Sequence, residues 1–194
     1  NVGYQMKLSK SYIIETQRCR LRCVSLEDIP HVFSATRYQG FNDGMLWEPP
    51  TEKEELVEPY QRRIISWENG EAYTFTIESK DSKNFIGRIS IRKGEILGVW
   101  NIGFWTHPIY QGQGYMTECA QAVLDFGFNE LKAEKIEALH ALWNKASERV
   151  LQKIGMNYIE YVSQGFVKKE KWVEENRLGI SREDWQIKKT RSIS

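Results

Sequence analysis

The hydrophobic pattern of the chain changes within one stretch, Trp105-Thr106-His107-Pro108-Ile109-Tyr110-Gln111-Gly112-Gln113-Gly114-Tyr115-Met116-Thr117-Glu118. Before it, hydrophobic residues alternate with a period of two, which is typical of strands. After it, they recur on one helical face, at Met116, Ala120, Val123, Leu124, Phe128 and Leu131. The stretch is therefore predicted to be a glycine-containing turn from a strand into a long helix. Free backbone N–H groups and the helix dipole at such a turn favour a phosphate or pyrophosphate.

The residues before this turn predict a meander of strands preceded by two helices. Alternation predicts strands over residues 18–24, 72–79, 85–92 and 95–106, with a hairpin turn at 81–84. Ser25 is the expected N-cap of the first helix. Thr51 is the expected N-cap of the second, which ends at Asn69-Gly70. Residues 40–50 form the loop between the two helices.

After the long helix, the pattern predicts a strand over 135–142, a helix over 144–154 that stops at Gly155, and a strand over 156–166. The antiparallel partner that closes the sheet is either 172–180 or 184–188, and the spacing does not decide between them. This order of elements predicts an α+β fold with a mixed sheet.

Length and composition set further limits. The 194 residues carry a formal net charge of +1, and at about 150 residues per domain they predict one domain. The balanced charge argues against nucleic-acid binding through a broad basic field. No apolar run approaches the ~20 residues of a membrane span, and residues 1–10 lack the apolar segment of a signal peptide. Three cysteines and three histidines form no convincing metal cluster, so we expect a reduced, cytoplasmic protein without metal.

The glycine turn alone fits several ligand classes, and an ordinary tight turn fits it as well. A Walker loop requires Gly-Lys-Ser/Thr, whereas Tyr115 follows Gly114. A dinucleotide-binding turn would place a third glycine at Thr117, which weakens the hypothesis of a nucleotide-dependent oxidoreductase.

The surroundings of the turn make it specific, because they resemble the acetyl-CoA-binding segment of the GNAT superfamily of N-acetyltransferases. That family's pattern is Gln/Arg-x-x-Gly-x-Gly/Ala; Gln111 and Gly114 match it, and Met116 departs at the last position. Residues 101–118 and 144–156 resemble the RimJ/RimL-like branch of ribosomal-protein N-terminal acetyltransferases. The resemblance covers about residues 10–188. It implies a single acetyltransferase domain over 1–194, with a mixed, mostly antiparallel sheet of six to seven strands, about four helices, and strands that splay at the cofactor site.

The resemblance also implies acetyl-CoA as co-substrate. Its pantetheine arm would pair with backbone groups of Phe104, Trp105 and Thr106, and a backbone N–H there would hold the thioester oxygen. Its pyrophosphate would lie on the N–H groups of Gln111, Gly112, Gln113, Gly114, Tyr115 and Met116. Asn144 is a good helix N-cap, and the resemblance adds a hydrogen bond from its amide to the pantetheine.

Two residues are the candidate catalytic groups. Ser147 shares the inward face of its predicted helix with Leu151 and Ile154, and the resemblance implies that it binds the cofactor and protonates the leaving thiolate. A small packing residue is the alternative. Many relatives use a tyrosine seven residues after the Asn, where this chain has Leu151. Glu160 resembles the branch's candidate base, with a solvent-facing strand glutamate as the alternative.

Trp47, Glu48 and Trp105 are the candidate acceptor-binding residues, because in relatives the loop between the first two helices covers the substrate groove. Aromatic and acidic residues in this loop would suit a cationic amine beside an apolar wall, and a packed loop is the alternative. The sequence thus predicts an acetyl-CoA-dependent N-acetyltransferase in which a primary amine, of a protein N-terminus or a small molecule, attacks the thioester directly. A non-catalytic acyl-CoA-binding module is the alternative, favoured by Met116 and Leu151. A homodimer is common among relatives.

Overall fold

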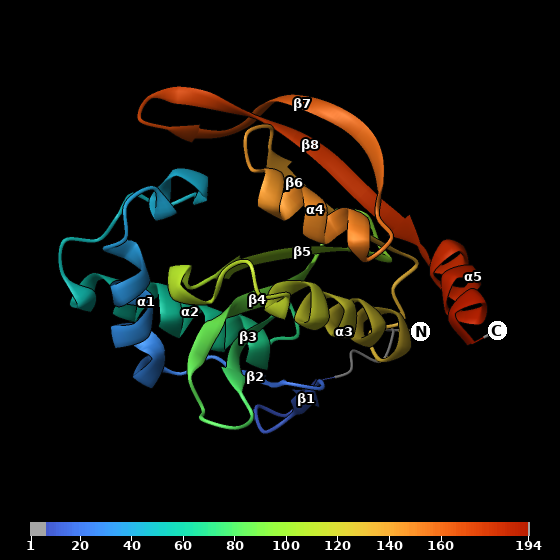
Figure 1. The fold of residues 1–194 in the computed structure, drawn as a ribbon, viewed down its shortest axis with the longest axis horizontal. Helices are drawn as coiled ribbons and strands as arrows, with labels where there is room; N and C mark the ends of the chain where they lie inside the picture. Colours follow the sequence, from blue (N-terminus) through green and yellow to red (C-terminus); the bar gives the residue numbers. More distant parts are fainter. Residues whose placement is uncertain (1–6, 194) are drawn as a thin grey trace.

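The computed structural model describes residues 7–193, which form one eight-stranded sheet and five α-helices (Figure 1). The strands are β1 (Ile13–Glu15), β2 (Cys19–Cys23), β3 (Ala72–Ser79), β4 (Phe85–Lys93), β5 (Val99–Thr106), β6 (Lys135–Ala141), β7 (Asn157–Lys168) and β8 (Lys171–Ser181). The helices are α1 (Ile29–Thr36), α2 (Val57–Glu68), α3 (Tyr115–Asn129), α4 (Lys145–Lys153) and α5 (Arg182–Ile193). None of these helices is long and apolar enough to cross a membrane.

The sheet has the order β1-β2-β3-β4-β5-β6-β8-β7 and is antiparallel except between β5 and β6. Short turns join β3, β4 and β5 into the expected meander, whereas α3 is the crossover that lets β6 run parallel to β5. The predicted α+β fold with a mixed, mostly antiparallel sheet is confirmed. It has more elements than predicted because the three-residue β1 adds a strand and residues 182–193 form a helix. Of the two candidate closing segments, 172–180 is correct, since it lies within β8.

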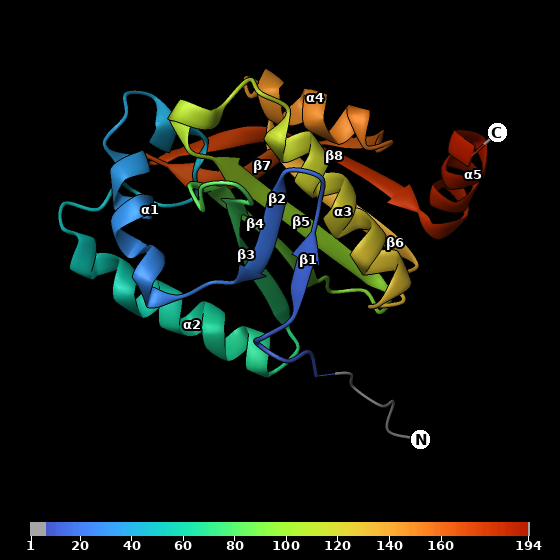
Figure 2. The same cartoon turned by 60° about the horizontal axis from the view of Figure 1, so that its bottom comes forward.

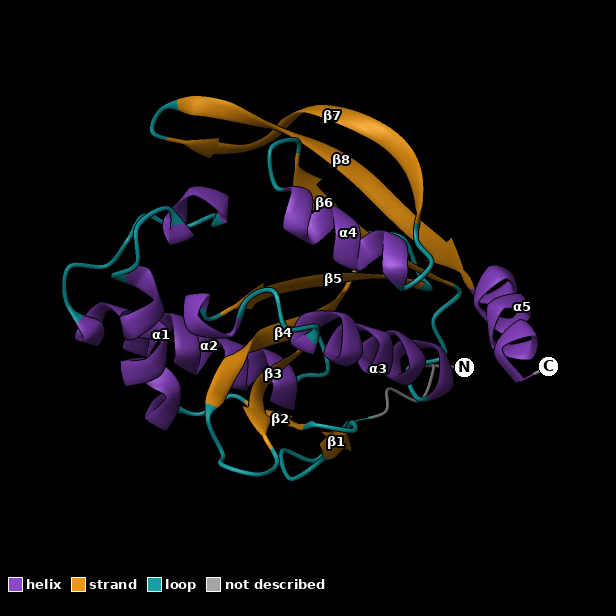
Figure 3. Cartoon of the chain, viewed as in Figure 1, coloured by secondary structure: helices purple, strands orange, loops and turns teal. Residues whose placement is uncertain are grey.

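Helices cover both faces of the sheet. Figures 1 and 2 show α3 and α4 next to each other on one face, with α1 and α2 together at the opposite side. Figure 3 shows α5 at the far end of β8. The larger core lies between the sheet and α3, and includes Ile89, Ile91, Val123, Leu124 and Phe128. A smaller core joins α1, α2 and the loop of residues 40–50 to the other face of β4 and β5, and includes Val32, Tyr60, Phe85 and Trp105.

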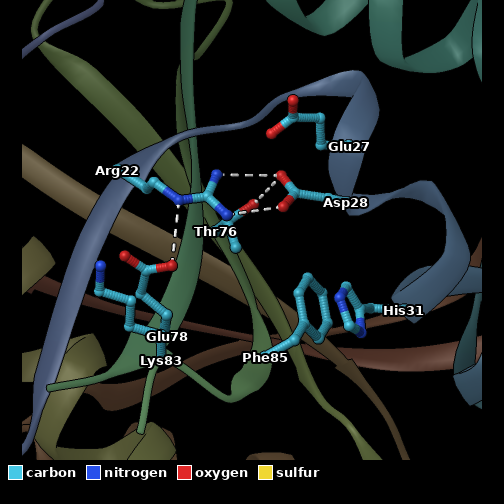
Figure 4. A pocket seen from close by; sticks show the side chains of 8 residues that line it. All are labelled: Arg22, Glu27, Asp28, His31, Thr76, Glu78, Lys83 and Phe85. Carbon is cyan, nitrogen blue, oxygen red and sulfur yellow. Dashed lines mark hydrogen bonds and ion pairs between the residues drawn. The ribbon is translucent and has the colours of Figure 1, made fainter. Parts of the chain in front are cut away.

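The start of the first helix follows the sequence prediction, because Ser25 accepts from the N–H of Glu27 and forms a capping box with Asp28. The Asp28 carboxylate also accepts from Arg22 at 2.7 Å and from the Thr76 hydroxyl at 2.6 Å (Figure 4). These groups line a polar cavity of about 160 Å³ and bond to one another. The cavity therefore anchors the entry of α1 to β2 and β3.

The predicted N-cap of the second helix is wrong. The Glu55 carboxylate accepts from the N–H groups of Thr51 and Glu52, at 2.7 Å each. This bonding makes Glu52 the cap of a short 3₁₀ turn, Lys53–Leu56, and α2 begins only at Val57. Pro59 consequently lies in the first turn of α2, where a missing N–H costs no helical hydrogen bond.

Candidate active site

The parallel strands β5 and β6 diverge at their carboxyl ends. They pair only between Val99–Asn101 and Lys135–Glu137, whereas β5 remains paired with β4 as far as Thr106. Among the described strands, none pairs with the β6-facing edge of residues 102–106. This is the predicted splay. It leaves backbone groups of Phe104 and Thr106 along an open gap, whereas Trp105, like His107 with its bond to Ile86, turns its backbone groups toward β4.

The glycine turn after β5 has an open outer side. Gly112 and Gly114 have φ of +73° and +79°, a left-handed conformation that glycine adopts without strain. No backbone carbonyl within residues 7–193 accepts from the N–H groups of Gly112, Gln113 or Gly114. A Cβ placed on Gly112 would meet no atom of residues 7–193 within 4 Å, its two chain neighbours aside. Because α3 begins at Tyr115, the turn combines free donors, space and the positive end of a helix dipole.

Two glutamine side chains form hydrogen bonds within this turn. Gln111 and Gln113 donate to the carbonyls of Thr106 and Ile109, at 3.2 Å each. Met116 is 6% exposed and packs in the larger core, as does Leu151 at 1%. Neither of these departures from the family pattern therefore occupies the turn or the gap.

Arg18 lies against the same turn, although it is 95 residues from Gln113 in sequence. Its Nη1 donates to the Gln113 carbonyl at 3.0 Å, and its guanidinium lies 4.2 Å over the Tyr115 ring. The Glu118 carboxylate holds it through a 2.8 Å ion pair with Nε. Burial raises the pKa of Glu118, but hydrogen bonds from Thr16 and Arg18 outweigh it and lower that pKa overall. Glu118 is thus a structural anchor for Arg18.

The start of α4 presents two polar groups. Asn144 is its N-cap, because Oδ1 accepts from the Ser147 N–H at 3.2 Å. Within residues 7–193, no acceptor is recorded for the Asn144 amide N–H groups, and no hydrogen bond is recorded for the half-buried Ser147 hydroxyl. Capping therefore leaves both groups available to a ligand.

His140 also lies beside the gap, on β6 beyond its last pair with β5. Its Nδ1 lies 2.8 Å from the Ala141 carbonyl; a carbonyl only accepts, so Nδ1 donates and Nε2 is an acceptor. Nε2 is buried without a partner among the described residues. His140 is therefore buried with only one of its two ring nitrogens bonded to the described residues. An orphaned acceptor here fits a ligand in the gap.

Glu160 lies on β7, the edge strand, and β8 separates it from β6. Its side chain is 56% exposed and accepts from Arg177 Nε at 2.9 Å. On β8, Glu175 is only 7% exposed, and the carboxylate has no hydrogen bond to the described part of the chain. Burial raises the pKa of Glu175, and the nearby Arg177 partly offsets this. Glu175 was missed because its burial depends on the pairing of β8 with both β6 and β7.

The loop of residues 40–50 packs over β5. Trp47 lies edge-on to Trp105, with ring centroids 6.4 Å apart, and Glu48 is exposed. From β7, Lys168 donates to the carbonyls of Met45 and Trp47, at 3.0 and 2.6 Å. Next to these bonds, a groove of about 460 Å³ is lined by Asp43, Trp143, Lys168, Lys169, Lys171 and Val173. The sheet thus brings the loop and the β7–β8 hairpin together over one groove.

Comparison with known proteins decides the family. A model described as "Acetyltransferase (GNAT) domain" matches residues 18–157, most of the chain. The chain belongs to the GNAT acetyltransferase family. The matched part includes the β5–β6 gap, the glycine turn and α4, so the residues predicted to bind the cofactor lie within the matched range.

Two relatives from Bacillus subtilis are similar to the chain, and one of them is named as an N-acetyltransferase. The chain is 33% identical to the uncharacterized N-acetyltransferase YnaD of Bacillus subtilis over 59% of its own length and 67% of that protein's. It is 35% identical to the uncharacterized protein YkkB of the same organism, over 74% of its own length and 84% of the length of YkkB. The GNAT domain and the N-acetyltransferase name of YnaD identify the protein as an acyltransferase.

Solved GNAT structures share the fold. An acetyltransferase from Bacillus anthracis superposes with a TM-score of 0.78 at 24% identity, over 89% of this chain and 99% of that one. RimL, the ribosomal L7/L12 α-N-protein acetyltransferase, was solved in complex with Coenzyme A; it has a TM-score of 0.79 at 19% identity, over 88% and 98%. Spermidine N-acetyltransferase from Vibrio cholerae was solved in complex with CoA and spermine. It superposes with a TM-score of 0.74 at 20% identity, over 87% of this chain and 98% of that one. These three structures therefore show that the chain has the GNAT fold.

Proposed function

We propose that this GNAT protein transfers the acetyl group of acetyl-CoA to a primary amine by direct attack on the thioester. The observation that carries the proposal is the unpaired edge of β5 leading directly into a glycine turn with free N–H groups. An extended arm that ends in a pyrophosphate needs those two features in that order. The neighbour solved with Coenzyme A supports the same ligand.

The residues that would hold acetyl-CoA come from three elements. Backbone groups of Phe104 and Thr106, on either side of Trp105, would bind the pantetheine arm, with the Asn144 amide opposite. The N–H groups of residues 112–116 would bind the pyrophosphate, since that of Gln111 already donates to the Pro108 carbonyl at 3.4 Å, and Arg18 adds a guanidinium beside them. Acetyl-CoA supplies an activated thioester: a C–N bond to the amine forms, and the C–S bond to CoA breaks.

Two proton transfers accompany this exchange. The amine loses a proton, and the departing thiolate gains one. We propose Ser147 for the second transfer, because its hydroxyl has no hydrogen bond to the described residues. For the first, Glu160 remains the candidate from the sequence. Glu175 is a second candidate, since it is buried and unbonded whereas Glu160 is exposed and paired with Arg177.

Trp47, Glu48 and Trp105 are proposed to line the acceptor side of the site. The RimL neighbour is named for a protein N-terminus and the V. cholerae neighbour for spermidine, so both acceptor classes belong in the assay. A single domain over residues 1–194, a homodimer and a cytoplasmic location also remain predictions.

The test combines binding with turnover. Acetyl-CoA should raise the melting temperature of the purified protein, and free thiol should be released when an amine from a panel of peptides, polyamines and amino acids is added. Stabilisation without acceptor-dependent thiol release from any class would favour the non-catalytic module. Absence of both effects in folded protein would refute the proposal.

A further inference from the structure

Arg88 is buried on the acceptor side of the sheet, and no carboxylate among residues 7–193 serves as its counter-ion. It is 8% exposed, and its guanidinium lies 5.3 Å from the Trp47 ring centroid, 5.6 Å from Tyr60 and 5.3 Å from Trp105. Its recorded hydrogen bond within residues 7–193 runs from Nη1 to the Tyr60 hydroxyl, at 3.3 Å. A guanidinium has five N–H donors, so most of them are left without a protein acceptor.

A second arginine adds to the same positive charge. The guanidinium of Arg63, on α2, lies 5.4 Å from the centroid of the Tyr60 ring, which Arg88 also approaches. Burial and the neighbouring charge of Arg88 lower the pKa of Arg63 to about 10. No carboxylate in the described part of the chain forms an ion pair with either arginine. Arg63 is partly exposed, whereas Arg88 is buried. Buried charges are normally paired, so the Arg88 guanidinium, with Arg63 nearby, favours an anion at this place.

Trp105 supplies a further donor at the same place. Its indole Nε1 is buried and has no partner among the described residues, and the residue is 6% exposed. Arg88 on β4 and Trp105 on β5 are register partners, so their side chains leave the same face of the sheet. Trp105 belongs to the splayed part of β5, where the thioester is proposed to lie.

The acidic residues of the loop over this face do not neutralise the arginines. Asp43 and Glu48 act on Lys168, where their charges partly oppose the lowering of its pKa by burial. Trp47 separates the two groups: its ring faces Arg88, and its carbonyl accepts from Lys168. The side of the loop that faces β4 and β5 therefore presents aromatic rings and uncompensated donors.

We propose that Arg88, Arg63 and the Trp105 indole N–H bind an anionic group of the acceptor. The acceptor is then a primary amine with a carboxylate or phosphate close to its amino group, as in an α-amino acid. We expect the anionic group close to the amine because the Arg88 guanidinium lies 5.3 Å from the ring of Trp105, which belongs to the part of β5 where the thioester is proposed to lie. A polyamine, which has no anionic group, is disfavoured. This inference rests on the proposed acetyl transfer.

The test uses matched acceptors. Standard amino acids are each compared with their carboxamide, O-phosphoethanolamine is compared with ethanolamine, and spermidine and N-terminal peptides complete the panel. Thiol release is expected to show about tenfold or higher kcat/KM for the anionic member of the pairs that react, the selectivity of a charged hydrogen bond. The amino-acid pairs test recognition of a carboxylate, and the O-phosphoethanolamine pair tests recognition of a phosphate. Preference for the amides, the peptides or spermidine would overturn the inference while leaving acetyl transfer intact, whereas no turnover on any acceptor would refute the proposed function.

Variants separate recognition from packing. Arg88→Met should raise KM for the anionic acceptor about tenfold or more and leave kcat/KM for its amide within about twofold. Trp105→Phe keeps the ring, removes the N–H, and should lower the same selectivity by about threefold or more. Arg62→Met is the matched control, because Arg62 neighbours Arg63 on α2 but is 63% exposed and paired with Glu58. Equal losses on both members of a pair in Arg88→Met and in Trp105→Phe would show that these residues only pack, and would overturn the inference.

Discussion

A substitution in the glycine turn should change folding stability and acetyl-CoA affinity by separate physical effects, which two measurements can distinguish. Gly112→Ala places a methyl group where, its two chain neighbours aside, no atom of residues 7–193 lies within 4 Å, at a φ of +73°. Its cost to the folded state is therefore the left-handed conformation alone, about 1–2 kcal/mol. If the pyrophosphate lies on this turn, the methyl group also takes space that the ligand needs. Affinity for acetyl-CoA should then fall by tenfold or more, about 1.4 kcal/mol.

The control for this change is Gly40→Ala. Gly40 has a φ of +80°, and the nearest atom to its added Cβ is Asp43 Oδ2 at 3.9 Å. The two variants therefore carry similar backbone strain. Gly40, however, lies in the loop of residues 40–50, on the proposed acceptor side of the site, and not in the glycine turn. Urea unfolding should show similar destabilisation of both, whereas calorimetric titration should show weakened acetyl-CoA binding in Gly112→Ala alone. Unchanged affinity in Gly112→Ala, or equal weakening in both, would refute the assignment of the turn.

Three further predictions follow from single side chains. Ser147→Ala should lower kcat and leave the Kd for acetyl-CoA unchanged, as measured by steady-state kinetics and titration; a parallel loss of both would indicate a packing role. Lys168→Met removes the donor to two carbonyls of the 40–50 loop and should raise the acceptor KM about fivefold or more without changing acetyl-CoA affinity; an unchanged KM would show that the loop position does not depend on this bond. Because burial raises the pKa of Glu175, the native state holds that proton more tightly than the unfolded chain does, and stability should fall as pH rises from about 4.5 through the raised pKa. Glu175→Gln should remove this part of the pH dependence in urea unfolding curves, and an unaltered profile would contradict the buried position.

Much of the fold follows from local patterns in the sequence. The change of period around Gly114, the Ser25 capping box and the alternation in β3 to β5 involve residues close to one another in the chain. The three-residue β1 is too short to produce a pattern of its own. In α5, Trp185 is the one buried residue among those described, so its sequence shows little helical amphipathicity.

The features of the site that depend on local backbone geometry could be predicted from the sequence. Those that depend on packing between distant parts of the chain could not. The glycines and Asn144 act through local geometry, which their residue types indicate directly. Arg18, Arg88 and Glu175 acquire their environments from partners far away in sequence, such as Glu118 for Arg18 and Tyr60 for Arg88. An isolated arginine in a strand pattern gives no sign that it will be buried without a counter-ion.

The central claim is that one site binds acetyl-CoA and passes its acetyl group to an amine. The most direct measurement follows free CoA thiol and the acetylated amine together, by thiol titration and mass spectrometry, in one reaction of purified protein with acetyl-CoA and the acceptor panel. The account predicts equimolar thiol and N-acetylated product that require both substrates, and a marked loss of both in Gly112→Ala. Thiol released without an acetylated amine, or an acetylated amine formed equally fast by Gly112→Ala, would contradict it.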